Sequence, residues 1–323
     1  MPSGIRERRP RRAPEPADAG TMDSRHFMLA GALLSSLAAA QEPGSKQGVT
    51  CAPVLDLTFG VYTTDRPTVL YRQFLPVLEA LQDAMAAELR QPVDIQLRIF
   101  RDYDSARVAL VEDEIDFVRF GPSSYILARR ENPCVKLLAM EHVDGQKTFK
   151  GMIVVRKESP IRSAEDLRGR RFAFGDENST IGRYFAQEML VGAGIHAGDL
   201  ARYEYLGRHD KVFKAVEKGD FDAGSLKSGT FEQLNTENQL RVLVEFDVVT
   251  KPWVARAGLD RRVTEAITAS LMKIRDPQVL AALGVSGFTT ATDDDYAPIR
   301  QSMVESERFD AKPEQQPDPR PGR

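Results

Sequence analysis

The feature that most constrains this chain is a regular alternation of strand-like and helix-like segments between residues 55 and 303. Strands are indicated where apolar and polar residues alternate, as in 55–61 and 93–99. A helix is indicated over 70–89, where apolar residues recur at helical spacing. Because strands separated by helices form βαβ units, this order predicts parallel sheets flanked by helices.

The pattern predicts more strands than one small sheet normally holds. Strands are predicted at 55–61, 93–99, 115–120, 135–140, 151–155, 171–174, 202–205, 221–224 and 240–246. The main helices are predicted at 70–89, 105–112, 123–130, 181–193, 211–218, 229–234, 260–274, 277–283 and 293–303. Roughly nine short strands fit two sheets better than one. We therefore expect two α/β lobes, with a ligand cleft between them at strand ends and helix starts.

The two ends of the chain differ from this body. Residues 1–40 are interpreted as a secretory signal peptide, because Arg25-His26 precedes a short apolar stretch that ends in small residues. Met22 is an alternative start, in which case 1–21 would be a wrongly assigned extension. Residues 41–53 are a predicted linker. Residues 304–323 are rich in proline and charge and are predicted to be a disordered tail.

Composition excludes several classes of function. Lys and Arg total 44 against 47 Asp and Glu, a net charge of −3 that argues against nucleic-acid binding. Two cysteines and four histidines without ligand spacing argue against a metal centre, and no cofactor is expected. A bridge between Cys51 and Cys134 would be compatible with export, but two free thiols remain an equal alternative. No phosphate-binding P-loop motif is present.

Chemically versatile side chains gather where predicted strands turn directly into helices. The clearest junction is 172–182, where Ser179 and Thr180 stand at a predicted helix start. The unpaired N–H groups there, the two hydroxyls and the helix dipole would suit an oxyanion. The alternative is that Ser179 and Thr180 only cap the helix.

Three further junctions share this character, although each can also be ordinary turn chemistry. They place imidazole, hydroxyl and phenol groups after strands: His209 in 205–211, Ser123, Ser124 and Tyr125 in 120–125, and Tyr103 in 101–104. Together with the first junction they predict a site rich in uncharged hydrogen-bond donors.

The order and spacing of the motifs over about residues 54–303 resemble a known family. The motifs are Gly60-Val61-Tyr62, Phe74-Leu75-Pro76-Val77-Leu78, Asp102-Tyr103, Asp116-Phe117, Phe120-Gly121-Pro122-Ser123-Ser124-Tyr125, Val154-Val155-Arg156-Lys157-Glu158-Ser159-Pro160-Ile161, Ser163-Ala164-Glu165-Asp166-Leu167-Arg168-Gly169, Gly175-Asp176-Glu177-Asn178-Ser179-Thr180, Gly207-Arg208-His209-Asp210 and Gly219-Asp220-Phe221-Asp222-Ala223-Gly224. This pattern is similar to the phosphate, phosphite and phosphonate substrate-binding proteins of ABC transporters, which are type II periplasmic binding proteins.

The resemblance implies a two-lobed clamshell in which each lobe is a mostly parallel sheet flanked by helices. Two crossing segments would join the lobes near 151–157 and 242–250. Lobe 1 would then hold 54–150 and 248–303, and lobe 2 would hold 151–247. The ligand-binding residues that the resemblance implies are Ser179, Thr180, Tyr103, His209, Ser123, Ser124 and Tyr125, and Tyr62 and Lys227 are further candidates.

The chain departs from the family pattern at positions that bear on the ligand. Ile181 replaces one hydroxyl of the family's Ser-Thr-Ser-Gly loop, and Phe149 lacks a phenol. Lys227 and Lys251 stand near positions where relatives that bind aminoalkylphosphonates carry carboxylates. Because lysine repels a cationic amine, a smaller or more anionic ligand is expected.

The resulting hypothesis is an exported solute-binding protein that is not an enzyme. It would capture a small phosphorus oxyanion, act as a monomer and deliver the ligand to an ABC permease in the inner membrane. Asp176 or Asp210 could accept a proton from the ligand and so disfavour sulfate. The alternatives are a periplasmic sensory module for a membrane kinase and, more remotely, a hydrolase using Ser179 or Ser123 with His209 and Asp210.

Overall fold

The computed structural model describes residues 52–64 and 66–311, and their strands form two separate sheets. In the first sheet the strand order is β11-β4-β10-β3-β1-β2, and in the second it is β7-β6-β8-β5-β9. The first sheet contains β1 (Leu55–Tyr62), β2 (Val93–Phe100), β3 (Phe117–Arg119), β4 (Lys136–His142), β10 (Pro252–Ala255) and β11 (Gly287–Thr289). The second contains β5 (Thr148–Arg156), β6 (Arg171–Phe174), β7 (Arg202–Tyr205), β8 (Ala223–Lys227) and β9 (Leu240–Val249).

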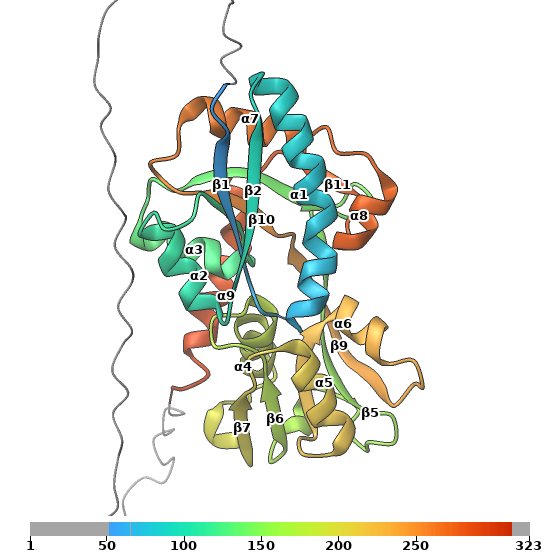
Figure 1. Cartoon of the computed structure of the whole chain (residues 1–323). Coiled ribbons are helices and arrows are strands. Elements are labelled where there is room, and N and C mark those ends of the chain that lie inside the picture. The colour runs from blue at the N-terminus through green and yellow to red at the C-terminus, as the bar shows by residue number, and fades with distance from the viewer. Residues whose placement is uncertain (1–51, 65, 312–323) are drawn as a thin grey trace, which may run out of the picture. The chain divides into compact units, whose positions relative to one another are not determined.

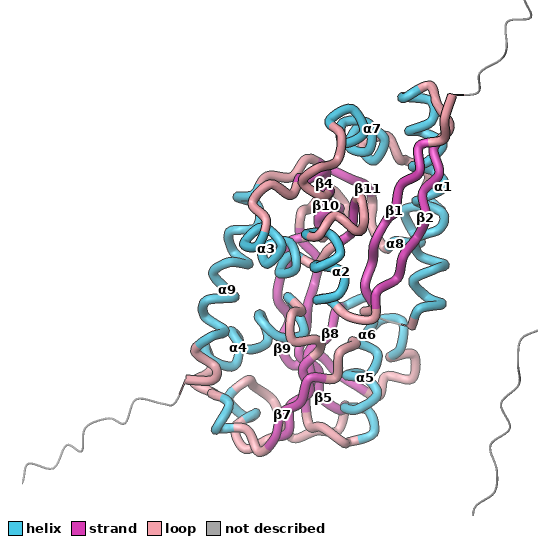
Figure 2. Tube along the Cα trace, turned by 60° about the vertical axis from the view of Figure 1, so that its left-hand side comes forward, coloured by secondary structure: helices cyan, strands magenta, loops and turns pink. Residues whose placement is uncertain are grey.

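Helices cover both faces of each sheet, so each lobe is an α/β unit as predicted (Figures 1 and 2). In the first lobe, α1 (Pro67–Leu89), α7 (Arg261–Leu271) and α8 (Pro277–Leu283) cover one face, and α2 (Tyr103–Val111) and α3 (Pro122–Glu131) cover the other. In the second, α5 (His209–Lys218) and α6 (Ser228–Leu234) lie opposite α4 (Ala186–Gly192) and α9 (Ala297–Glu307). None of the described helices combines the length and apolar character needed to cross a membrane.

The sheets are mixed, whereas mostly parallel sheets were expected. In the first sheet β1 runs parallel to β2 and β3, but β10 is antiparallel to both β3 and β4. In the second, β5 is antiparallel to β8 and β9. The chain returns from β9 into β10 without a crossover helix, and therefore β10 enters its sheet in the reverse direction.

Two crossings join the lobes where the chain passes from β4 to β5 and from β9 to β10, and α9 later spans them, contacting α3 of the first lobe and α4 of the second. The crossings lie at 143–147 and 250–251, so the expected segments at 151–157 and 242–250 fall mainly inside β5 and β9. Those strands pair antiparallel over their whole length, from Thr148 opposite Val249 to Arg156 opposite Leu240. The Thr250 N–H donates to the Lys147 carbonyl at 2.9 Å, which holds the two crossings side by side.

The C-terminal segment is ordered further than predicted. Helix α9 continues to Glu307, and the side chain of Phe309 is completely buried. Its ring lies 5.5 Å from that of Phe174, and its carbonyl accepts from the Ala197 N–H at 2.8 Å. The apolar Phe309 fixes residues 304–311, which composition alone had assigned to a disordered tail. Residues 312–323, the predicted signal peptide, Cys51 and most of the linker lie outside the described residues.

A glycine contact sets the position of the loop after β6. The Cα atoms of Gly175 and Gly182 approach so closely that a Cβ on Gly182 would lie 2.7 Å from Gly175 Cα. The Gly175 N–H also donates to the Gly182 carbonyl at 2.8 Å. This close packing presses the start of the following helical segment, which is the π-helical turn η2 (Thr180–Phe185), against the end of β6.

Gly182→Ala should lower the unfolding free energy, because the added methyl group meets backbone atoms that have no room to move. We expect a loss of about 1–3 kcal/mol in urea denaturation, the usual effect of overpacking. Gly192→Ala is the matched control, because a Cβ there has no atom within 4 Å. That control should be neutral or gain about 0.5 kcal/mol; equal losses in both variants would contradict the proposed contact.

Candidate functional site

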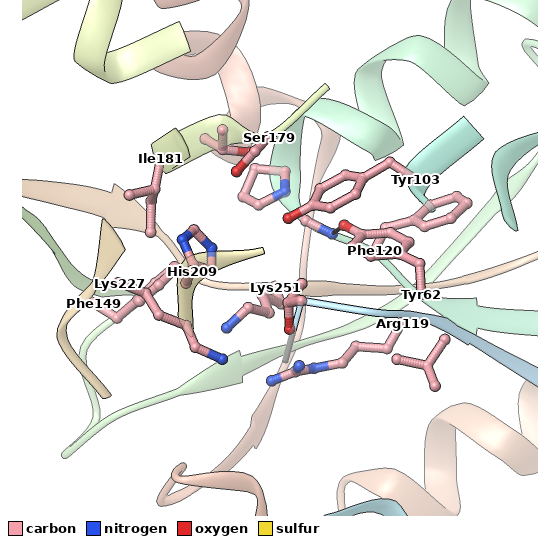
Figure 3. A pocket seen from close by; sticks show the side chains of 15 residues that line it. Tyr62, Tyr103, Arg119, Phe120, Phe149, Ser179, Ile181, His209, Lys227 and Lys251 are labelled. Atoms are coloured by element: carbon pink, nitrogen blue, oxygen red, sulfur yellow. Dashed lines mark hydrogen bonds between the residues drawn. The ribbon is translucent and has the colours of Figure 1, made fainter. Parts of the chain in front are cut away.

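A small cavity lies between the lobes, and residues of both sheets form its wall (Figure 3). Its volume is about 30 Å³, which suits a compact group of a few heavy atoms. Its described lining residues are Val61, Tyr62, Thr64, Tyr103, Arg119, Phe120, Gly121, Pro122, Phe149, Ser179, Thr180, Ile181, His209, Lys227 and Lys251. The structure thus brings six of the nine predicted site residues to one cavity: Tyr62, Tyr103, Ser179, Thr180, His209 and Lys227.

Four helical segments begin at the cavity wall. Tyr103 is the first residue of α2, Pro122 of α3 and His209 of α5, and Ser179 caps the turn η2, which continues into α4. The first N–H groups of a helix have no partner inside the helix, and its dipole is positive at that end. Four such ends facing one space favour an anion there.

A hydroxyl bridge ties the lobes together beside the cavity. The Ser123 N–H, in lobe 1, donates to Thr180 Oγ1 at 2.9 Å, and Ser123 Oγ donates to the Asn178 carbonyl at 2.6 Å. The two hydroxyl oxygens are 2.8 Å apart. Because the hydroxyl proton of Ser123 goes to Asn178, the Thr180 hydroxyl donates to Ser123 Oγ. Both lobes are therefore in direct contact at the site.

Ser179 holds the start of η2 in place. Its Oγ accepts from the Gly182 N–H at 2.9 Å, and its side chain is almost fully buried while still lining the cavity. Capping and ligand contact, which the sequence left as alternatives, are thus compatible at Ser179. The turn is π-helical, a form that often marks functional sites in proteins.

Two tyrosines form the aromatic wall on the side of lobe 1. The rings of Tyr62 and Tyr103 stack with centroids 3.8 Å apart. The Tyr62 hydroxyl accepts from the Gly121 N–H and lies 3.2 Å from Ser124 Oγ. Burial raises the pKa of Tyr62 to about 12, so its phenol stays protonated at neutral pH. Tyr62 therefore supports the 121–124 turn as well as lining the cavity.

The other side of the cavity carries cationic side chains. In Figure 3, Lys227, Lys251 and Arg119 extend their nitrogen atoms toward the same region. Arg119 is paired with Glu141 through two short contacts of 2.5 and 2.8 Å, and Trp253 Nε1 donates to the same carboxylate at 3.2 Å. None of the described residues that line the cavity is a carboxylate, so the described wall is positively charged.

Arg119 was missed in the sequence, although a signal was available. It stands in the otherwise apolar run 117–120, and arginine is rarely buried unless it is paired. Lys251 and Phe149 were noted only as departures from a family pattern, yet both line the cavity. The ammonium of Lys251 lies 4.4 Å from the Phe149 ring centroid, a cation–π contact.

Three predicted site residues do not line the cavity. Ser123 is buried at the lobe contact, and Ser124 bonds to Tyr62 behind the wall. Tyr125 points elsewhere: its hydroxyl donates to Asp293 at 2.9 Å and its ring packs on Tyr296. A turn at a helix start can direct only its first residues toward a ligand, because the helical rotation carries the next ones into the core.

The two candidate proton-accepting carboxylates are not among the lining residues either. Asp210 is paired with Arg208 through contacts of 2.9 and 3.0 Å. Asp176 is half-buried, and its burial raises its pKa to about 6, with repulsion added by Asp104 of α2 and by Asp102, which caps that helix. Asp176 therefore belongs to the facing surfaces of the lobes rather than to the cavity wall.

Two known proteins are similar to this chain in sequence. A probable ABC transporter phosphite binding protein, PhnD1, from Prochlorococcus marinus (strain MIT 9301) is 28% identical over 278 residues, covering 76% of this chain and 93% of the relative. The phosphonates-binding periplasmic protein of Escherichia coli (strain K12) is 25% identical, covering 76% of this chain and 75% of that protein.

The fold has solved counterparts. The structure of PhnD1 from Prochlorococcus marinus in complex with methylphosphonate has a TM-score of 0.68 and 24% identity, and it covers 78% of this chain and 98% of that one. This likeness confirms the predicted two-lobed, type II binding-protein fold. A family model described as "ABC transporter, phosphonate, periplasmic substrate-binding protein" matches residues 59–296. The chain belongs to this family of periplasmic substrate-binding proteins of phosphonate ABC transporters.

Proposed function

We propose that this chain captures a small phosphorus oxyanion, namely phosphite, phosphate or a simple phosphonate, in its interlobe cavity and delivers it to an ABC importer. The observation that carries the proposal is the meeting of four helix starts around a small cavity whose described charged lining residues are cations. The names of the relatives point the same way, since one is called phosphite binding and the other phosphonates-binding.

The hydrogen-bond donors around the small cavity are sufficient for micromolar affinity. Hydrogen bonds to a charged acceptor contribute about 1.5–3 kcal/mol each, and micromolar binding needs about 8 kcal/mol. Three or four bonds from Ser179, Tyr103 and the helix-start N–H groups reach that value. Because most of these donors are uncharged, the ligand can be released when the lobes separate.

Closure of the lobes would complete the site. The Thr180–Ser123 bridge and the bond from the His209 N–H to the Thr64 carbonyl, at 3.2 Å, both join one lobe to the other. When the lobes part, these bonds are lost and the helix starts become hydrated. Closing removes that water and strengthens each hydrogen bond to the ligand. The closed form is the one that a permease would recognise.

The competing functions receive less support. The family consists of transporter binding proteins, which confirms that the chain is not an enzyme. The hydrolase set is also not assembled, because Asp210 is paired with Arg208 rather than orienting His209. Membership of an ABC transporter family favours delivery to a permease over a sensory role.

Location and assembly complete the proposal. The family is periplasmic, and we propose that residues 1–40, or 22–40 if translation starts at Met22, direct export. We propose that the protein acts as a monomer, because one chain supplies both walls of the cavity.

Replacing Ser179 and Thr180 together by alanine should weaken the binding of phosphite and methylphosphonate at least tenfold, about 1.4 kcal/mol, in isothermal titration calorimetry. The change removes two hydroxyls from the cavity and breaks the Ser123–Thr180 bridge. Ser270→Ala is the matched control, since that hydroxyl is buried in α7 away from the cavity. Unchanged affinity in the double variant would place the ligand elsewhere.

Asp176→Asn should raise the melting temperature near neutral pH. Because the pKa of Asp176 is raised from 3.8 to about 6, the folded chain binds this proton more tightly than the unfolded chain. Stability is therefore lost as the pH rises from about 4 to about 6, and asparagine avoids that loss while still accepting from the Asn178 N–H. We expect a gain of a few degrees at neutral pH that disappears near pH 4.

Asp210→Asn is the control for this pH dependence. It removes a carboxylate that is paired with Arg208, so it should give no gain near neutral pH. If Asp176→Asn raises the melting temperature equally at both pH values, then burial and the charges of Asp102 and Asp104 do not destabilise the ionised Asp176 carboxylate.

A further inference from the structure

A second and much larger cavity adjoins the first. Its volume is about 700 Å³, and it shares the lining residues Arg119, Phe149, Lys227 and Lys251 with the small cavity. Its other walls come from the start of α1, the crossing segment 143–146, α6 and the end of α8. The function proposed above assigns the oxyanion to the small cavity and leaves the larger one without a role.

The four shared residues stand at the boundary of the two cavities, which we call the neck. Phe149 and Lys251 stand together there in their cation–π contact, and Figure 3 shows Lys227 extending toward Lys251. Arg119 is held in place by Glu141, so this part of the neck is fixed. A group attached to a ligand in the small cavity has this neck as its path into the larger one.

The charges of the larger cavity balance among its described lining residues. Four are cationic, Arg119, Lys150, Lys227 and Lys251, and four are anionic, Glu141, Asp144, Glu232 and Asp247. Arg119 pairs with Glu141, and Lys150 with Asp247 at 3.0 Å. Uncharged polar residues stand between them, namely Gln73, Gln146, Thr148, Ser228, Gln233 and Thr250. The remaining described lining residues are mostly apolar, among them Val69, Val143 and Leu283, so the wall offers hydrogen bonds beside apolar surface and carries no excess charge of either sign.

We propose that the larger cavity holds an uncharged, polar substituent of the ligand, so that the substrate class is phosphonates with hydroxyl- or amide-bearing chains. This inference rests on the function proposed above. The volume lies within the range of about 300–1,000 Å³ that small-molecule sites occupy. A wholly apolar chain would cover the polar residues of the wall without replacing the hydrogen bonds that water makes with them. A charged end would lose hydration in a cavity that carries no excess opposite charge.

The ligand panel that tests the proposal contains methylphosphonate, hydroxypropylphosphonate, propylphosphonate and aminopropylphosphonate, each titrated calorimetrically into the full mature protein. Hydroxypropylphosphonate should bind at least as tightly as methylphosphonate. Propylphosphonate and aminopropylphosphonate should each bind at least about tenfold more weakly than hydroxypropylphosphonate. Loss of affinity for every longer chain would overturn the inference and leave the oxyanion site intact. Failure of all four ligands and of phosphite would instead contradict the proposed function.

A bulky residue in the larger cavity gives the second arm. Gly229 lines it, and a Cβ there has no atom within 4 Å, so Gly229→Trp adds a large side chain at this wall without a backbone clash. We expect at least a tenfold loss for hydroxypropylphosphonate, with methylphosphonate unchanged within twofold. Gly198→Trp is the matched control, because it is equally open but lines neither cavity.

A second variant, on the opposite wall of the larger cavity, shows whether a loss of affinity in Gly229→Trp comes from misfolding of that region. Ala282→Trp, on α8, should reproduce the selective loss without altering lobe 2. Equal losses for the short and the long ligand in both tryptophan variants, or no loss in either, would overturn the assignment of the larger cavity.

Discussion

The convergence of helix N-termini between two sheets is the constraint on which this site depends. The turns after β2, β3, β6 and β7 each lead into a helical segment that begins at the same small cavity. Each start has a positive dipole end, and these ends would repel one another without an anion or water between them. An oxyanion is therefore the expected occupant. The helix starts favour an anion of any kind, and the side-chain hydroxyls add selectivity among anions.

The same donors also hold the lobes together, and this links binding to movement. Thr180 bonds across to Ser123 beside the cavity, so a movement of the opposite lobe changes the bonding of a hydroxyl that lines the cavity. Carboxylates on both lobes, Asp176 on one and Asp102 and Asp104 on the other, repel each other when the lobes approach. Closure is then a balance between hydrogen bonds gained at the cavity and repulsion at its edge, which keeps release of the ligand possible.

Much of the fold could be predicted because apolar periodicity is local, whereas long-range pairing is not. The nine predicted strands all have counterparts, but β10 and β11 were missed, since they are short and one begins with a proline. The helix-start residues Ser179, Tyr103 and His209 were predictable from strand-to-helix junctions. Arg119 and the exclusion of Tyr125 from the cavity were not, because they depend on which face of the sheet or helix the fold turns inward.

The most direct test of the central claim is a crystal structure of the mature protein with methylphosphonate. We expect the phosphonate oxygens to lie within hydrogen-bonding distance of Ser179, Thr180 and the N–H groups that begin η2, with lobe 1 contacting the ligand through Tyr103 or the 121–123 turn. A ligand bound outside the space between the lobes, or held without any contact to those hydroxyls and N–H groups, would contradict it.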